Sequence, residues 1–210
     1  MKVTDKIEIT NEDNMELMAR YPDNYFDLAI VDPPYGIKAS NMTMGSGKHK
    51  FDKTKKWDDN IPSEDYFKEL FRVSKNQIIW GGNYFTDYLH PTPHWLIWDK
   101  KNPNLSFAEG EMAWVRNGKN LRIYQIYSAL ADTVGGKMHP TQKHVKLYEW
   151  QLMNYAKEGD KILDTHLGSG SIALACHNLG YELTACELDK DYFEASIKRI
   201  QNHVAQQRLF

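Results

Sequence analysis

The sequence predicts an α/β fold in which a doubly wound, mostly parallel sheet carries helices on both faces. Short apolar runs alternate with helix-like segments along most of the chain. One apolar run ends at Asp32 and a later one at Asp164, and a glycine-containing loop follows the second aspartate and leads into a helix. Because ligands bind beyond the carboxyl ends of the strands in such sheets, we expect the functional site at these two strand ends.

The apolar run Leu28–Val31 is followed directly by Asp32, Pro33, Pro34 and Tyr35. The two prolines fix φ and keep the turn out of a helix, which directs the aspartate carboxylate and a prolyl carbonyl to one point. Two such acceptors suit the exocyclic amino group of a nucleic-acid base, and the tyrosine ring suits stacking on that base. The base must be flipped out or already single-stranded to enter. An ordinary proline turn is the alternative interpretation.

The middle of the chain is expected to supply a helix and two further strands. Two acidic residues follow Ser63, which predicts a helix start there, and apolar residues then recur at helical spacing. These apolar residues, which we expect in the core, are Tyr66, Phe67, Leu70, Phe71 and Val73. Strands are expected at Gln77–Trp80 and Trp95–Trp98. We interpret Trp80 and Trp98 as core residues, and lining of a base pocket is the alternative.

Residues Glu111–Val115 and Leu121–Tyr127 alternate between apolar and polar side chains, which is typical of strands. The Asn117–Gly118 pair between them is typical of a hairpin turn, so we predict a hairpin that completes the sheet. If the substrate is a nucleic acid, its sequence would have to be recognised by residues 36–57, by a small target-recognition region within residues 101–138, or by a partner protein.

The second strand end lies at Lys161–Asp164, and residues 165–171 are expected to lead into the helix Ile172–Leu179. Gly168 and Gly170 let the backbone approach a ligand closely at a helix N-terminus. A loop that serves only close packing is the alternative.

The strand after this helix, Glu182–Cys186, ends at Glu187, whose carboxylate can accept both hydroxyls of a ribose. The glycine loop and this acid together predict a nucleoside site. If Asp32 and Asp164 end neighbouring strands, the nucleoside site and the base pocket meet.

A lysine-rich segment, residues 36–57, follows the tyrosine directly. Its basic residues, which we expect to contact DNA phosphates, include Lys38, Lys48, Lys50, Lys53, Lys55 and Lys56. The formal net charge of the chain is −2, so binding to nucleic acid requires a local positive patch of this kind. We expect a mobile loop that is poorly ordered without DNA. A solvated surface loop is the alternative.

Composition favours a single domain over residues 1–210, since the chain is 41% apolar and has the length of one domain. No apolar stretch is long enough to cross a membrane, and no secretory signal is visible. Cys176 and Cys186 lack disulfide or zinc-ligand spacing, so we expect no metal and a reducing, cytoplasmic location.

The motifs resemble those of the DNA amino-methyltransferases that use S-adenosylmethionine, in the group whose catalytic motif precedes its cofactor motif. The segments that carry the resemblance are Asn11–Asp13, Tyr21–Asp23, Asp32–Tyr35, His139–Lys143, Glu187–Asp189, Tyr192 and Arg199–Ile200. The resemblance implies a Rossmann-like methyltransferase fold with permuted motif order. It also implies a bacterial cell, or a phage-infected one, as the place where the protein acts.

The resemblance also implies roles for individual residues. Asp32, Pro33, Pro34 and Tyr35 would carry the reaction. The residues expected to bind the cofactor are Asp13, Asp32, Thr141, Lys143, Asp164, His166, Gly168, Ser169, Gly170, Ser171 and Glu187. Thr165 and His166 depart from the family, which usually has Pro-Phe there, and His144 stands where proline is common. His166 is expected to stack on the methyl donor or to hydrogen-bond to it.

An aspartate before Pro-Pro-Tyr is associated in the family mostly with N6 of adenine, so the resemblance implies an adenine-N6 DNA methyltransferase. The alternatives are an N4-cytosine enzyme, which more often carries serine, and an RNA methyltransferase of the same fold. A protein-glutamine enzyme would have asparagine at position 32. A dehydrogenase or nucleotide-binding module that uses only the glycine loop would leave Asp32–Tyr35 unexplained. Exposed aromatic residues would fit either a homodimer contact or a base-stacking surface.

Overall fold

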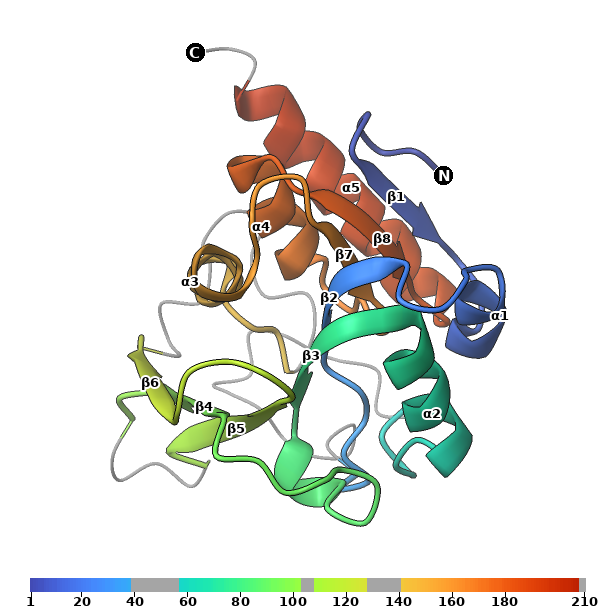
Figure 1. The fold of residues 1–210 in the computed structure, drawn as a ribbon. Coiled ribbons are helices and arrows are strands. Elements are labelled where there is room, and N and C mark those ends of the chain that lie inside the picture. The colour runs from blue at the N-terminus through green and yellow to red at the C-terminus, as the bar shows by residue number, and fades with distance from the viewer. Residues whose placement is uncertain (39–56, 103–107, 128–140, 208–210) are drawn as a thin grey trace.

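The computed structural model describes residues 1–38, 57–102, 108–127 and 141–207. Figure 1 shows an eight-stranded sheet with helices on both sides. The strands, in their order across the sheet, are β1 (Ile7–Thr10), β8 (Glu182–Cys186), β7 (Lys161–Asp164), β2 (Phe26–Val31), β3 (Ser74–Trp80), β5 (Gly110–Val115), β4 (Trp95–Asp99) and β6 (Arg122–Gln125). The helices are α1 (Asn14–Ala19), α2 (Glu64–Val73), the short 3-10 helix η2 (Gly82–Tyr84), α3 (Val145–Tyr155), α4 (Ser171–Leu179) and α5 (Lys190–Gln207).

The sheet has a parallel part and a mixed part. From β1 through β8, β7 and β2 to β3, every neighbouring pair is parallel. Strand β5 is antiparallel to both of its neighbours, β3 and β4, whereas β4 pairs parallel with β6. The predicted fold class, a doubly wound and mostly parallel sheet, is confirmed.

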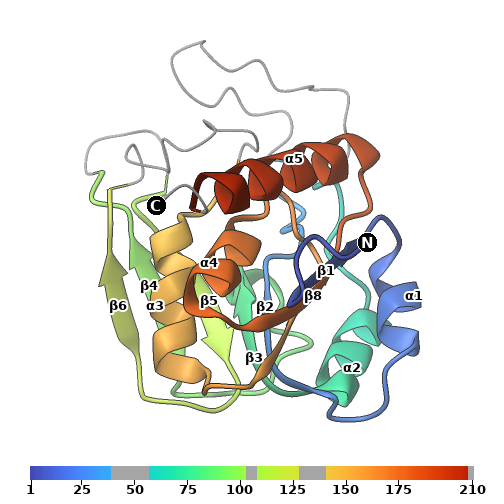
Figure 2. The same ribbon diagram turned by 90° about the horizontal axis from the view of Figure 1, so that it is seen from above.

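Alternate residues of the central strand β2 face two separate cores, because successive side chains of a strand point to opposite faces. Leu28 and Ile30 belong to the core beneath α3, α4 and α5, whereas Ala29 and Val31 belong to the core beneath α1 and α2. Figure 2 shows the two helical layers on their two sides of the sheet. All four side chains are at most 1% exposed. Burial of each large aliphatic side chain stabilises the fold by about 1.5–3 kcal/mol.

Helix α2 begins where the sequence predicts. The Ser63 hydroxyl accepts a hydrogen bond from the Tyr66 backbone N–H at 3.4 Å, which is an N-cap. The expected core positions of this helix are buried, with Phe71 half-buried. Trp80 and Trp98 are also core residues, 0% and 3% exposed.

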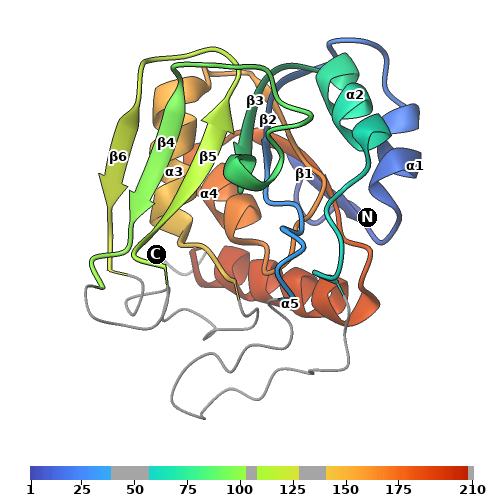
Figure 3. The same cartoon turned by 90° about the horizontal axis from the view of Figure 1, so that it is seen from below.

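The predicted hairpin between residues 111–115 and 121–127 is wrong. Strand β4 lies between β5 and β6 (Figure 3), and β6 pairs parallel with β4. The backbone of Asn117 exchanges hydrogen bonds of 2.9 and 3.0 Å with the side chain of Asn76, at the start of β3. This contact holds the connection against β3, so the chain does not turn back along β5.

Among the described residues, no helix is long and apolar enough to span a membrane. Cys176 and Cys186 are both buried and free.

Candidate active site

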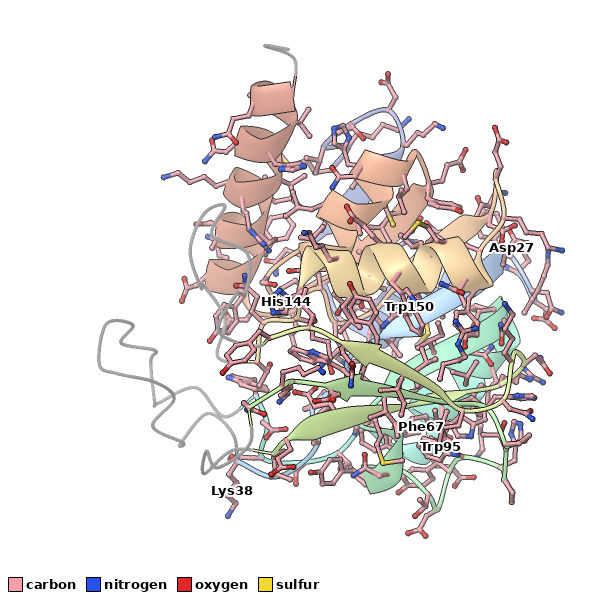
Figure 4. The ribbon with its side chains drawn as sticks, turned by 90° about the vertical axis from the view of Figure 1, so that its left-hand side faces the viewer. Asp27, Lys38, Phe67, Trp95, His144 and Trp150 are labelled. Carbon is pink, nitrogen blue, oxygen red and sulfur yellow. The ribbon has the colours of Figure 1, made fainter. Side chains whose placement is uncertain are left out.

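The two motif-bearing strand ends are neighbours in the sheet. Leu28 and Ala29 of β2 pair with Ile162 and Leu163 of β7, so both strands finish at the same edge. Figure 4 shows which end this is: Lys38, which follows the motif, lies at one end of the molecule, and Asp27, near the start of β2, lies at the other. Asp32 and Asp164 therefore lie close together at the same edge of the sheet, as the sequence predicts.

The Asp32 carboxylate is held by two donors. Its Oδ1 accepts from the Tyr35 hydroxyl at 2.6 Å, and its Oδ2 accepts from Lys143 Nζ, also at 2.6 Å. The Lys143 ammonium also lies 3.2 Å from the Tyr35 hydroxyl. The Lys143 side chain is only 1% exposed, whereas Asp32 is 18% exposed. Burial raises the pKa of the Asp32 carboxyl, and the nearby ammonium opposes that rise.

Two further charged residues extend this pair. Glu111 of β5 lies 3.0 Å from Lys143 Nζ through Oε2 and 2.6 Å from Lys100 Nζ through Oε1. Burial alone would raise the pKa of the Glu111 carboxyl, but the two ammonium groups outweigh it and lower that pKa to about 2. The result is a chain of alternating charges: Asp32, Lys143, Glu111 and Lys100.

The Tyr35 ring is fixed by aromatic neighbours and by a glycine. It stacks on Tyr84 with a centroid distance of 5.1 Å and an interplanar angle of 16°, and its other contacts include the edge of Phe85. A Cβ at Gly81 would overlap this ring, and Gly81 has a φ of 70°. The buried Asp58 carboxylate accepts the backbone N–H of Tyr35 at 2.6 Å. One face of the expected stacking residue is thus covered by Tyr84, which is itself 43% exposed.

The glycine loop is held mainly through its backbone. Gly168, with a φ of 53°, donates its N–H to Glu187 Oε2 at 2.8 Å, and Asp189 donates its N–H to Glu187 Oε1 at 2.9 Å. Gly170, with a φ of 74°, immediately precedes α4 and packs closely against Ile200 of α5. Burial raises the pKa of the Glu187 carboxyl.

Arg199 of α5 holds the same loop through two hydrogen bonds. Its guanidinium donates to the Ser169 carbonyl and to the Ser171 hydroxyl, both at 2.9 Å, and the hydroxyls of these serines lie 3.1 Å apart. Arg199 is 4% exposed. The serine hydroxyls thus face protein groups that fix the loop.

Thr165 and His166 belong to a hydrogen-bonded chain that connects the loop to two helices. His166 Nδ1 lies 2.9 Å from the Thr165 hydroxyl, which lies 2.8 Å from the hydroxyl of Tyr66 in α2. On the other side, His166 Nε2 lies 3.2 Å from the amide nitrogen of Asn14, in α1. Burial lowers the pKa of His166 to about 3, so the ring is neutral at physiological pH. Asp164 accepts the His166 backbone N–H at 3.0 Å, and burial raises its pKa to about 8.

The structure brings most of the predicted residues into these two adjoining regions. Asp13 caps α1 by accepting the Met15 backbone N–H at 2.8 Å, next to the Asn14 that reaches His166. Lys143, which the sequence places with the cofactor residues, contacts the Asp32 motif. Thr141 is half-buried two residues before it, and Lys38 is exposed. The other expected DNA-contacting residues lie outside the described residues, namely Lys48, Lys50, Lys53, Lys55 and Lys56.

Several residues of the region were not predicted as site residues, although Tyr66 was expected in the core and Arg199 belongs to a segment that carries the resemblance. They are Glu111, Lys100, Asp58, Tyr84, Asn14, Tyr66 and Arg199. Glu111 and Lys100 do stand at the polar ends of predicted strands, and this position was the sequence feature that could have indicated a role in the site. Their pairing depends on the order of β5 and β4, which the sequence did not predict.

Comparisons with known proteins agree with this architecture. The family model N6_N4_Mtase, described as DNA methylase, matches residues 79–198, which is more than half of the chain. The match includes the glycine loop, Glu111 and Lys143. The Asp32–Tyr35 segment precedes it.

Two curated relatives span most of the chain. The Type II methyltransferase M2.DpnII of Streptococcus pneumoniae is 23% identical over 244 residues, covering 93% of this chain and 90% of its own length. The Type II methyltransferase M.HpaI of Haemophilus parainfluenzae is 23% identical over 224 residues, covering 86% of this chain and 69% of its own length.

Solved structures share the fold at low identity. The structure of the M1.HpyAVI–SAM complex superposes with a TM-score of 0.64 at 20% identity, covering 92% of this chain and 98% of that one. The cytosine-N4-specific PvuII DNA methyltransferase gives a TM-score of 0.63 at 14% identity, covering 97% and 94%. These structures show the fold, and the matching family model shows that the chain belongs to the N6/N4 DNA methylase family.

Proposed function

We propose that this protein transfers a methyl group from S-adenosylmethionine to N6 of adenine in DNA. One observation carries the proposal: Asp32, the glycine loop and Glu187 follow the carboxyl ends of the neighbouring parallel strands β2, β7 and β8. Membership of the DNA methylase family supports the reaction class.

The glycine-loop region fits an adenosyl cofactor. Glu187 is oriented by two backbone N–H groups, one on each oxygen, which leaves lone pairs of both oxygens for ribose hydroxyls. The left-handed φ values of Gly168 and Gly170 permit close backbone approach at the start of α4. When bound, S-adenosylmethionine supplies an electrophilic methyl group.

The Asp32 region supplies the acceptors for the target amine. Within the described part of the chain, no donor binds the carbonyl of Pro33 or Pro34. The Asp32 carboxylate is oriented by its hydrogen bond from the Tyr35 hydroxyl. A carboxylate and a carbonyl that accept the two N–H bonds would orient the nitrogen and stabilise the positive charge that develops on it. The exposed ring of Tyr84 extends the aromatic surface beside this point.

DNA contacts are assigned to the lysines of residues 36–57, of which Lys38 lies within the part of the chain that the structure describes. Because these lysines would meet phosphates, the proposal requires affinity for DNA that falls with rising salt. The target base would be flipped out of the duplex, since Asp32 is only partly exposed and cannot reach a stacked base.

Adenine is proposed over cytosine because residue 32 is aspartate, whereas the cytosine-N4 enzymes resembled by this chain more often carry serine. The structural likeness to the cytosine-N4-specific PvuII enzyme favours cytosine as the second candidate. The fold accommodates either substrate.

The test is nucleoside mass spectrometry of unmethylated DNA after incubation with the protein and S-adenosylmethionine. Asp32→Ala is the inactive variant, and Asp27→Ala, at the opposite end of the same strand, is its control. N6-methyladenine formed by the wild type and by the control, but not by Asp32→Ala, is the expected result. N4-methylcytosine would correct the base, and no modified base in DNA would overturn the proposal and direct the search to RNA.

A further inference from the structure

Glu111 is a buried carboxylate beside the proposed base pocket, and the reaction outlined above does not use it. It reaches Lys143 from β5, a strand that is not adjacent to β2 in the sheet. Its two oxygens differ. Oε1 lies 2.6 Å from Lys100 Nζ, whereas Oε2 is buried and no described residue gives it an aligned hydrogen bond, although Lys143 Nζ is only 3.0 Å away.

Lys143 is thus shared unequally between two carboxylates. It makes an aligned hydrogen bond to Asp32 at 2.6 Å and only an ion-pair contact with Glu111. Its ammonium also lies 5.0 Å from the centroid of the Trp80 ring. A small rotation of the lysine end would therefore transfer its hydrogen bond from one carboxylate to the other without exposing the charge to water.

The proposed reaction gives this transfer a purpose. In the free protein both oxygens of Asp32 already accept a hydrogen bond, one from Tyr35 and one from Lys143. The Lys143 ammonium takes one lone pair of Asp32 Oδ2 and, as a cation at 2.6 Å, weakens that oxygen as an acceptor for the target amino group. A neutral amine competes poorly with an ammonium for a carboxylate unless the ammonium has a second anion to accept it.

We propose that Glu111 is a positioning residue that accepts the Lys143 ammonium when the target base enters and so strengthens Oδ2 of Asp32 as an acceptor for the amine. This inference rests on the proposed function, because it concerns the same pocket. Lys100 sets the strength of the effect, since it shares the charge of Glu111.

The arrangement predicts that removing Glu111 and removing Lys100 shift the pKa of Asp32 in opposite directions. Asp32 is surrounded by titratable or charged groups from several elements, namely Tyr35, Lys143, Glu111 of β5, Tyr66 of α2, Tyr148 of α3 and Asp164 of β7. The charge of Glu111 raises the pKa of Asp32. Removing Glu111 should therefore lower that pKa, and removing the positive charge of Lys100 should raise it.

The experiment compares Glu111→Gln, Lys100→Met and Glu111→Asp with the wild type and with Glu109→Gln, which alters an exposed acid two residues away. The pH dependence of kcat/KM for DNA is measured, together with the Kd for S-adenosylmethionine and the Tm. For Glu111→Gln we expect kcat/KM to fall about 10-fold to 100-fold, the effect of misplacing a reacting group. We also expect an unchanged Kd for the cofactor and an acid limb that moves to lower pH.

Lys100→Met should move the acid limb the other way, and Glu111→Asp, which keeps the charge, should return it towards the wild-type position. An acid limb that stays in place in Glu111→Gln, with only the Tm lowered, would show a purely structural role and overturn the inference. Absence of methyl transfer by the wild type would instead overturn the proposed function, so the two failures are distinguishable.

Discussion

The proposed base pocket around Asp32 and the glycine loop lie side by side but are built from different interactions. The pocket is organised by charged side chains from four separated segments, which bring Asp32, Lys143, Glu111 and Lys100 together. The loop is organised by backbone N–H and C=O groups, with Glu187 and Arg199 as their partners. The pocket should therefore respond to changes of charge and the loop to changes of backbone conformation. The predictions below test this division.

The largest effect is expected at Asp32. Asp32→Ala removes the acceptor that orients the amine, so we expect kcat to fall by about 1000-fold or more, since loss of one preorganised group costs roughly 100-fold to 1000-fold and the pocket also loses the partner of Lys143. The Kd for S-adenosylmethionine, measured by calorimetry, should change little. A variant with normal turnover would remove Asp32 from the reaction.

Gly81 offers a geometric test of the same pocket. In Gly81→Ala the new methyl group overlaps the Tyr35 ring, so the ring must move, and a displacement of about 1 Å can cost about 100-fold in rate. Gly159→Ala is the matched control, because Gly159 has a φ of 86° and nothing within 4 Å of the added Cβ. Both variants carry left-handed backbone strain, and only Gly81→Ala should lose activity. Equal losses would mean that strain alone is responsible.

Glu187 tests the loop. Glu187→Ala removes an acceptor for the ribose and also releases the Gly168 and Asp189 backbone N–H groups. Hydrogen bonds to a charged group contribute about 1.5–3 kcal/mol, so we expect the Kd for the cofactor to rise about 10-fold to 100-fold. Glu182→Ala, at the exposed start of the same strand, is the control. If Glu187→Ala changed kcat alone, the division between the two regions would fail.

The smallest effect concerns stability. The pKa of Asp164 is raised from 3.8 to about 8 by burial. Between these values the folded state holds a proton that the unfolded state has lost, so this residue makes the free energy of unfolding decrease as pH rises from about 4 to about 8. In Asp164→Asn we expect that decrease to shrink by at least about 1 kcal/mol. Urea denaturation at pH 5 and pH 8 measures the change in the free energy of unfolding, and Asp5→Asn, which alters an exposed aspartate, is the control. An unaltered pH dependence would mean that Asp164 is ionised in the folded protein.

The contacts around the glycine loop follow from the sequence more directly than the contacts around Asp32, for a physical reason. The loop residues lie within a short stretch, and Glu187 follows the next strand, so strand–loop–helix patterns were sufficient. Asp32–Tyr35 was also local. The lysine and glutamate that complete the pocket depend on the positions of β4 and β5, which long-range pairing decides, and the incorrect hairpin at Asn117–Gly118 shows that turn chemistry alone did not determine that pairing.

The hydrogen-bonded chain from Asn14 through His166 and Thr165 to Tyr66 has an evolutionary consequence. A Pro-Phe pair at positions 165 and 166 would leave the Tyr66 hydroxyl, which is buried, without its partner. Replacing residues 165 and 166 by a relative's Pro-Phe pair should therefore destabilise the protein unless Tyr66 is changed as well. Substitution of Tyr66 by phenylalanine should have to accompany the exchange, and lineages that carry one form of the loop should carry the matching residue in α2.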